Sequence, residues 1–181
     1  LFRYAPQGFL PPQKQDQLQQ LPRKRMNAEH TSVRDCFAGT PVLIVGGEGF
    51  LARNAIVALA ALNADITVLV REQRHSLPTN VGQLIVGDMR EIAVAREAIA
   101  GQQIVLNFAG VTSAVGSNRM PSVSLLEECL PHLSLIGACV EQTKSPLIVF
   151  PSSRLVYGKP VELPVNERHP TKPTTVYGIH K

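Results

Sequence analysis

The chain has 181 residues, of which 44% are hydrophobic and none is tryptophan, and its formal net charge is +4. That length and apolar content suit one domain with a real core plus a tail. The charge is uneven, because residues 1–38 hold six Lys/Arg against three Asp/Glu (+3) and residues 39–181 hold twelve against eleven (+1), so the folded part gives little support for nucleic-acid binding.

The three cysteines are odd in number and show no CxxC or Cys/His ligand spacing, which argues against a disulfide framework or a metal site. No apolar run approaches the roughly 20 residues that span a bilayer, and no signal-peptide pattern is visible. We therefore expect a cytoplasmic protein with reduced thiols and no membrane partner. Residues 1–38, rich in Gln, Pro and basic side chains, are expected to be a flexible tail or linker. The chain starts at Leu1 and stops at Lys181 inside a predicted helix, so we expect a piece of a longer protein.

Residues 39–181 alternate short apolar runs with helical patterns, which predicts an α/β fold with a mostly parallel, doubly wound sheet of the Rossmann type. Pro131 is expected to kink the longest helix because proline has no N–H to donate. In chain order the expected elements are a strand at 41–45, a helix at 50–62, a strand at 65–70, a loop at 72–80, a strand at 83–87, a helix at 90–99, a strand at 103–108, a helix at 122–142, a strand at 147–150, a loop at 158–173 and a helix from 174.

The first strand runs into the sequence Gly-Gly-Glu-Gly-Phe-Leu-Ala, which opens a helix. Gly46 would allow a tight turn, Gly49 would let the backbone approach a pyrophosphate, and Ala52 would let the helix pack closely on the strand. The first amides of that helix, at Phe50 and Leu51, offer N–H groups and a partial positive charge to phosphates. We interpret the motif as a dinucleotide-binding turn rather than a plain strand–helix corner.

Further motifs follow the other strands, at the carboxyl end of the sheet where open α/β folds bind ligands. In order, GxxGxxA, GDM, FAG, SSxxVYG and YxxxK resemble the extended short-chain dehydrogenase/reductase family, the NAD-dependent epimerase/dehydratases, and especially its sugar-nucleotide enzymes. The resemblance covers residues 41–181. It implies that the glycine loop holds NAD or NADP, that Asp88, next to Met89, contacts the adenine, that Ala109 and Gly110 lie beside the nicotinamide ribose, that Ser153 and Tyr177 are catalytic, and that Lys181 holds the ribose and activates the tyrosine.

The residues themselves agree with these implied roles. Tyr177 and Lys181 are four residues apart and share a helix face. An ammonium beside a phenol favours the phenolate, which can accept a proton from a sugar hydroxyl as hydride leaves the same carbon. Ser153 could orient that oxygen, or it could merely cap a turn. Similarly, Asp88 could cap the helix expected at 90–99.

Several residues depart from the family pattern. Val70 stands where NAD-preferring relatives carry an acid, and Arg71 follows it, which favours NADP unless Arg71 is simply paired with Glu72. Glu48 puts a carboxylate in the phosphate loop and is expected to face solvent. The Asn-Val-x-Gly-Thr run common in the family is missing around Pro131. His180, inside the YxxxK motif, is expected to face away from the catalytic groups, and Tyr157 to pack the long loop.

The leading hypothesis is the cofactor half of an NAD(P)-dependent sugar-nucleotide epimerase or dehydratase whose C-terminal substrate domain is absent. One alternative is an NADPH-dependent reductase of a keto sugar or another carbonyl, and another is a non-catalytic dinucleotide-binding regulatory or scaffold protein. A nucleotide sugar is the expected substrate of the whole protein, which could also form a homodimer as many relatives do.

Overall fold

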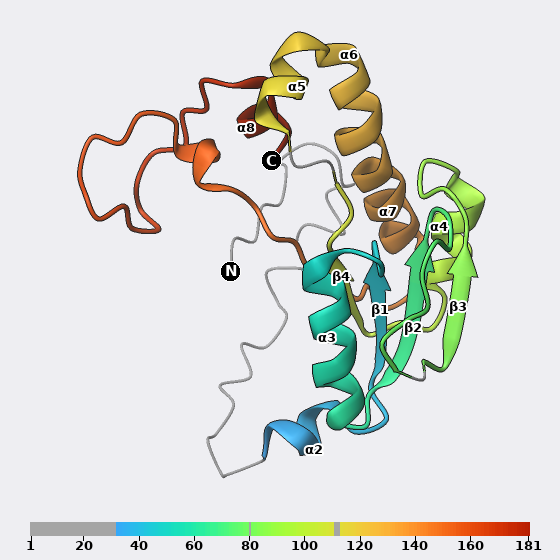
Figure 1. Ribbon diagram of the computed structural model, residues 1–181. Coiled ribbons are helices and arrows are strands. Elements are labelled where there is room, and N and C mark those ends of the chain that lie inside the picture. Colours follow the sequence, from blue (N-terminus) through green and yellow to red (C-terminus); the bar gives the residue numbers. More distant parts are fainter. Residues whose placement is uncertain (1–31, 80, 111–112) are drawn as a thin grey trace. The chain divides into compact units, whose positions relative to one another are not determined.

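The computed structural model describes residues 32–79, 81–110 and 113–181. A parallel five-stranded sheet in the order β3-β2-β1-β4-β5 organises this part of the chain (Figure 1). The strands are β1 (Pro41–Val45), β2 (Asp65–Val70), β3 (Gln83–Val86), β4 (Ile104–Asn107) and β5 (Leu147–Val149). Because β1 pairs with β2 on one side and with β4 on the other, the strand order reverses at β1. That reversal is where open α/β sheets place their ligand crevice.

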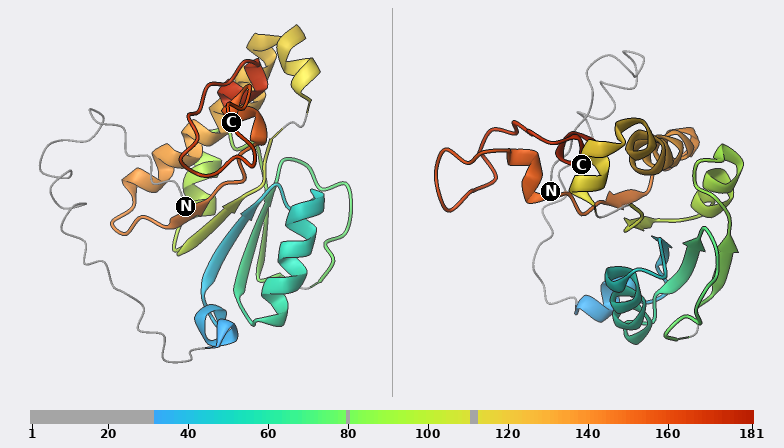
Figure 2. Two further views of the ribbon diagram at one scale, coloured as in Figure 1. Left: turned by 90° about the vertical axis from the view of Figure 1, so that its left-hand side faces the viewer. Right: turned by 45° about the horizontal axis from the view of Figure 1, so that its top comes forward.

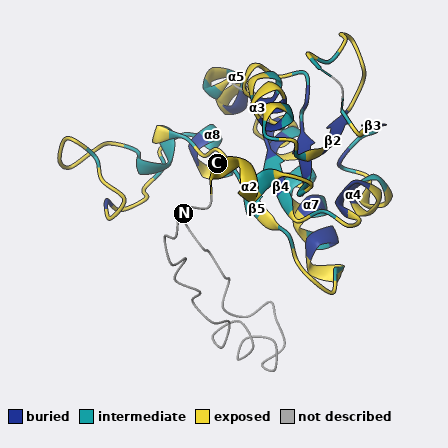
Figure 3. Ribbon diagram, turned by 90° about the horizontal axis from the view of Figure 1, so that it is seen from below, coloured by how far each residue is buried: buried dark blue, intermediate teal, exposed yellow. Residues whose placement is uncertain are grey.

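Helices cover both faces of the sheet, as the alternating pattern predicts (Figure 2). Helix α3 (Phe50–Ala61) packs on one face through Ala52, Ile56 and Leu59. Helices α4 (Ile92–Ile99) and α7 (Leu130–Glu141) cover the other face. The buried residues accordingly lie in the strands and on the inward sides of these helices (Figure 3). The predicted α/β class and parallel sheet are confirmed.

The long helix expected at 122–142 forms in three parts. Helix α6 (Pro121–Ser124) leads into a π-helical turn, Leu125–Cys129, which leads into α7. The amide of Leu130 donates to the carbonyl of Leu125, five residues back, just before Pro131, which has no N–H. The kink expected at the proline is thus taken up by a widened turn, a feature often found at functional sites.

The run Pro121–Glu141 is long and apolar enough, by length and composition, to cross a membrane. The expectation that no apolar run approaches the length of a membrane span is therefore wrong. The same test is passed by core helices, and here α7 buries Leu135, Ala138 and Cys139 against the sheet. We assign the run to the helical layer over the sheet.

Short helices complete the described part of the chain, and all but the last of them lie where no helix was expected. Helix α2 (Val33–Phe37) starts from a capping box of Ser32 and Asp35, and Phe37 packs against the α3 side of the core. The folded unit therefore begins at Ser32, within the stretch expected to be a tail; the rest of that stretch, 1–31, lies outside the described residues. The other short helices are α5 (Ala114–Arg119), a 3-10 turn (Arg154–Tyr157) and α8 (Val176–His180), the last as expected from residue 174.

Candidate functional site

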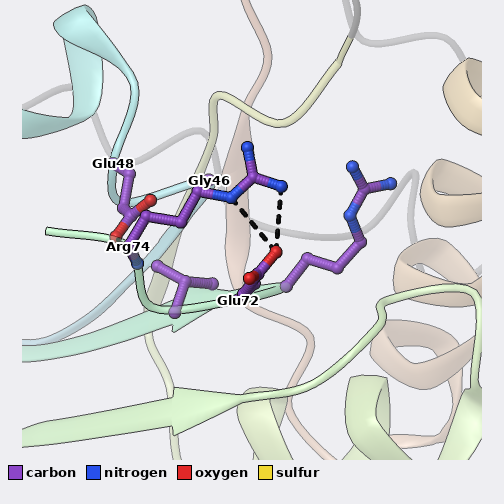
Figure 4. Close-up of a pocket in the computed structure, with 6 residues that line it drawn as sticks. Gly46, Glu48, Glu72 and Arg74 are labelled. Atoms are coloured by element: carbon purple, nitrogen blue, oxygen red, sulfur yellow. Dashed lines mark hydrogen bonds and ion pairs between the residues drawn. The ribbon is translucent and has the colours of Figure 1, made fainter.

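The carboxyl ends of the strands enclose two adjoining hollows. The larger, of about 290 Å³, is lined by Val45, Gly46, Gly49, Leu69, Arg71, Gly87, Asp88, Met89, Arg90, Phe108, Ala109, Gly110, Glu127 and Pro131. The smaller, of about 190 Å³, is lined by Gly46, Glu48, Val70, Arg71, Glu72 and Arg74 (Figure 4). Most of the residues predicted to hold a cofactor thus line a single cavity system.

Two positions of the loop after β1 have no room for a side chain and therefore require glycine. Gly46 has φ +78°, and a Cβ there would lie 3.0 Å from the backbone nitrogen of Ala109. At Gly47 a Cβ would lie 2.1 Å from the side chain of Val68, a packing role that the sequence argument did not assign. The loop is therefore held tightly between the ends of β1, β2 and β4.

Gly49, by contrast, is open towards the larger hollow. A Cβ there would meet only the carbonyl of Gly46, at 3.3 Å, and its φ of −68° suits any residue. Gly49 is the N-cap of α3 and supplies no side-chain cap, while Phe50 and Leu51 are exposed and Ala52 is fully buried. The first amides of a helix have no partner within it, so this end fits a phosphate group, and Ala52 packs the helix on the sheet as predicted.

Charged side chains join the ends of β2 and β3 to the π turn across the larger hollow. The guanidinium of Arg71 donates to Glu127 at 2.8 Å, and Arg90 donates to the other oxygen of Glu127 at 2.9 Å. The Nε of Arg90 also donates to both carboxylate oxygens of Asp88. This hydrogen bonding from Arg90 lowers the pKa of Asp88. Asp88 does not cap α4, because the N-cap of that helix is Glu91.

Glu48 is not turned to solvent as expected. Its carboxylate accepts the backbone amides of Arg74, at 2.6 Å, and His75, at 2.8 Å, and only 20% of its side chain is exposed. These amides, with His75 the larger contributor, lower its pKa. Glu72 is paired with Arg74, as the dashed lines of Figure 4 show, rather than with Arg71. Both carboxylates therefore brace the loop after β2.

A buried ion pair lies next to Gly110, which lines the larger hollow. The ammonium of Lys181 lies 3.0 Å from the carboxylate of Glu128, with 8% and 0% of the two side chains exposed. The same ammonium lies 5.6 Å from the centre of the Tyr177 ring. Gly110, at φ +148°, leaves room for the pair, because a Cβ there would come within 2.8 Å of the ammonium. The structure thus brings Tyr177, Lys181 and Gly110 together, as predicted.

Ser153 lies in the turn that supports this corner. It is the N-cap of the 3-10 turn, and its hydroxyl accepts the amide of Leu155 at 3.2 Å. The turn meets α8 closely, since a Cβ on Gly178 would lie 2.6 Å from the carbonyl of Leu155. Ser152 adds a hydrogen bond from its hydroxyl to the carbonyl of Lys181, at 3.0 Å. Ser153 therefore caps a turn, the simpler of the two roles considered, and its hydroxyl hydrogen is still able to donate.

Two neighbouring side chains have partners outside the Tyr177–Lys181 pair. The ring of His180 forms a hydrogen bond with the buried hydroxyl of Ser124 at 2.9 Å. Tyr157 packs edge-on against His169 of the long loop, with ring centres 5.6 Å apart.

The cysteines of the described part of the chain are all free thiols. The described residues also contain no cluster of side chains suited to a metal ion.

Glu127, Glu128 and His132 were missed by the sequence argument. The ring of His132 shares a hydrogen bond with Asn107 at 2.9 Å, and burial, followed by the charge of Lys181, lowers its pKa. An available signal was the adjacent acid pair inside an otherwise apolar helix. Side chains of that kind are seldom buried without a partner.

Residues 42–181 match the model of the NAD dependent epimerase/dehydratase family. UDP-glucose 4-epimerase of Azospirillum brasilense is 30% identical over 153 residues, covering 81% of this chain and 43% of the relative. The structure of UDP-glucose 4-epimerase from Bifidobacterium longum, in complex with NAD+ and UDP, superposes with a TM-score of 0.71 at 28% identity, over 78% of this chain and 46% of the other. The enzyme of Brucella ovis, in complex with NAD, gives 0.71 at 26% identity, over 78% and 44%. The chain therefore spans less than half the length of these relatives.

Proposed function

Because the chain belongs to the NAD dependent epimerase/dehydratase family, we propose that it binds a nicotinamide dinucleotide in the larger hollow and forms the cofactor half of an enzyme that acts on a nucleotide sugar. The observation that supports this most is the start of α3, which no side chain caps and whose N-cap residue, Gly49, lines the hollow. Those amides would hold the pyrophosphate. Asp88 and Met89 would line the adenine end and Ala109 and Gly110 the nicotinamide end.

The bound nicotinamide would supply hydride chemistry. The chain's own residues would handle the proton: Tyr177 would take it from a sugar hydroxyl, and Ser153 would donate to that oxygen. An ammonium has three N–H groups, so Lys181 can hold a ribose hydroxyl while it keeps its contact with Glu128. Epimerisation of a UDP-linked sugar is the form of this chemistry that the relatives' names suggest, and dehydration is the other activity in the family's description.

Binding is tested directly on this chain by calorimetry with NAD+. Gly49→Val should abolish binding, because a branched side chain would stand over the helix amides. Gly137→Ala in α7 serves as the control, since a Cβ there meets only Ile92, at 3.8 Å, and the residue lines neither hollow. Equal affinity for NAD+ in the Gly49→Val variant would refute the proposed site.

Catalysis is tested on a protein that extends through the substrate-binding part found in the relatives. Tyr177→Phe should leave NAD+ affinity and the fold unchanged while turnover of a UDP-sugar collapses, because the hydroxyl proton would then have no acceptor. Normal turnover after that substitution would exclude Tyr177 as the acid/base.

A dinucleotide-binding protein without turnover is the second candidate. One observation favours it: the ammonium of Lys181, which the resemblance assigns to the ribose and the tyrosine, is already held by buried Glu128. NAD+ binding by the longer protein without turnover of any nucleotide sugar would select this candidate. The preference for NADP, the NADPH-dependent reductase and the cytoplasmic location stay predictions.

We also propose that the whole protein is a homodimer formed through the helical layer. Leu126, Leu133, Ile136 and Val140 lie along the outer side of the π turn and α7, each about half exposed or more. A second copy would bury this apolar surface, of a kind that monomeric proteins seldom leave open. Sedimentation of the longer protein should give a dimer that Leu133→Glu dissociates; a monomeric unsubstituted protein would refute the assignment.

A further inference from the structure

Glu127 belongs to the π turn and projects into the larger hollow, with 29% of its side chain exposed. Its two carboxylate oxygens have different partners. One accepts from Arg71 at 2.8 Å and the other from Arg90 at 2.9 Å. Glu127 in the helical layer thus binds the guanidinium of Arg71, which follows β2 and lies 56 positions away in the sequence.

The two arginines differ in how completely they are engaged. Arg90 also donates to the carboxylate of Asp88 from its Nε and Nη2 atoms. The same carboxylate accepts a hydrogen bond from the backbone amide of Arg90 at 2.9 Å. For Arg71 the ion pair found in the described part of the chain is the one with Glu127. Its side chain is 61% exposed and lines both hollows. Arg71 is therefore the guanidinium that a ligand could capture by displacing one carboxylate.

Two other carboxylates lie near the end of β2, and both are engaged elsewhere. Glu72 pairs with Arg74 at 2.9 Å, and Glu48 accepts the amides of Arg74 and His75. Asp88 also interacts with the charge of Arg71, but its main partner is Arg90. The positive charge of Arg71 is thus offset mainly by Glu127, with which it forms its ion pair.

We propose that Glu127 is a cofactor-discrimination residue, which lowers the affinity of the chain for a 2′-phosphorylated dinucleotide by neutralising Arg71. This inference rests on the proposed dinucleotide site. NADP differs from NAD by a 2′-phosphate on the adenosine ribose, an anion that guanidinium groups bind well. In NADP binding, that phosphate has to compete with Glu127 for Arg71 and faces a further negative charge. NAD carries no such group and leaves the Arg71–Glu127 pair intact.

The test measures the dissociation constants of NAD+ and NADP+ for the chain by calorimetry at one fixed salt concentration. Glu127→Gln should strengthen NADP+ binding about tenfold, since a charge-assisted hydrogen bond is freed for the phosphate. NAD+ binding should change much less. The double variant Glu127→Gln/Arg71→Gln should lose the gain, because the effect acts through Arg71.

The matched control is Glu141→Gln. Glu141 on α7 pairs with Arg96 on α4 at 2.7 Å and lines neither hollow. The control therefore changes the net charge by the same amount as Glu127→Gln but leaves the lining of the hollows intact. Circular dichroism melting checks that each variant is folded. Three results would overturn the inference while leaving the dinucleotide site in place. The ratio of the NAD+ and NADP+ dissociation constants could stay unchanged in Glu127→Gln, it could change equally in Glu141→Gln, or the gain in NADP+ affinity could persist in the double variant. Failure of the unsubstituted chain to bind either nucleotide would overturn the proposed function and this inference together.

Discussion

The carboxylate of Glu128 lies 3.0 Å from the ammonium of Lys181, and the two side chains come from the π turn and the end of α8, 53 positions apart. Both are withdrawn from solvent, with 0% and 8% of their surfaces exposed. Removing one partner of a buried ion pair leaves an uncompensated charge, which is far more costly than removing both. The pair therefore couples the helical layer to the segment that carries Tyr177.

That coupling can be measured with a double-mutant cycle. Glu128→Gln should lower the free energy of unfolding by about 3 kcal/mol, and Lys181→Met by a similar amount. The double variant should be clearly more stable than the sum of the two losses predicts. Urea unfolding followed by circular dichroism gives all four values, and strictly additive losses would show that the two charges do not interact.

The close approach of the glycine loop to β4 makes a second prediction. Gly46→Ala should destabilise the chain both by backbone strain at φ +78° and by the contact of its Cβ with the Ala109 backbone. Gly101→Ala isolates the strain, because Gly101 has φ +75° and nothing within 4 Å of its Cβ position. Strain alone costs on the order of 1 kcal/mol. The melting temperature of Gly46→Ala should fall well below that of Gly101→Ala; equal melting temperatures would mean that the contact relaxes freely.

From the partly buried imidazole of His132 we predict a loss of stability in mild acid. Burial and the charge of Lys181 lower its pKa, while Glu128 opposes them. A histidine whose pKa is lowered on folding stabilises the fold fully above the unfolded value of about 6.5 and loses that contribution as the pH falls through the folded pKa. The free energy of unfolding should therefore decrease below about pH 6.5. His132→Gln should flatten that slope; an identical slope would assign it to other groups.

The cysteines should differ in reactivity. Burial raises the pKa of Cys139 to about 11, and 4% of the residue is exposed, whereas Cys36 is exposed. Because the thiolate is the nucleophile, a disulfide reagent at pH 8 should label Cys36 rapidly and Cys139 only on unfolding. Cys36→Ser should remove the fast phase. Rapid labelling of Cys139 in the folded chain would show that α7 opens readily.

Periodic features carried most of the fold prediction. The strands at 41–45 and 65–70 have the expected bounds. The first is an uninterrupted apolar run, the second is apolar apart from Asp65 and Thr67, and the sheet buries most residues of both. Helix α4 starts two residues later than expected, at Ile92, because Asp88 closes a turn with the amide of Arg90 before the helix begins. The start of a helix depends on such local competition, which composition does not reveal.

The site divides in the same way. Gly46 and Ala52 occupy the structural positions that the motif predicts, because the needs of a tight turn and close packing are local. The partners of Arg71 and Lys181 were not predictable from spacing, since both come from the π turn. That turn precedes Pro131, which has no N–H, and carries both tertiary ion pairs; of these features only the proline is visible in the sequence.

The π turn also fixes the rotational phase of the helical layer. Successive residues of an α-helix are about 100° apart around its axis. The adjacent Glu127 and Glu128 have different partners, because Glu127 pairs with Arg71 in the larger hollow and Glu128 pairs with the buried Lys181. Loss or gain of one residue in Leu125–Cys129 would rotate both carboxylates relative to α7 by about that angle. Such a length change would therefore break both ion pairs at once, whereas a side-chain substitution can remove either pair alone.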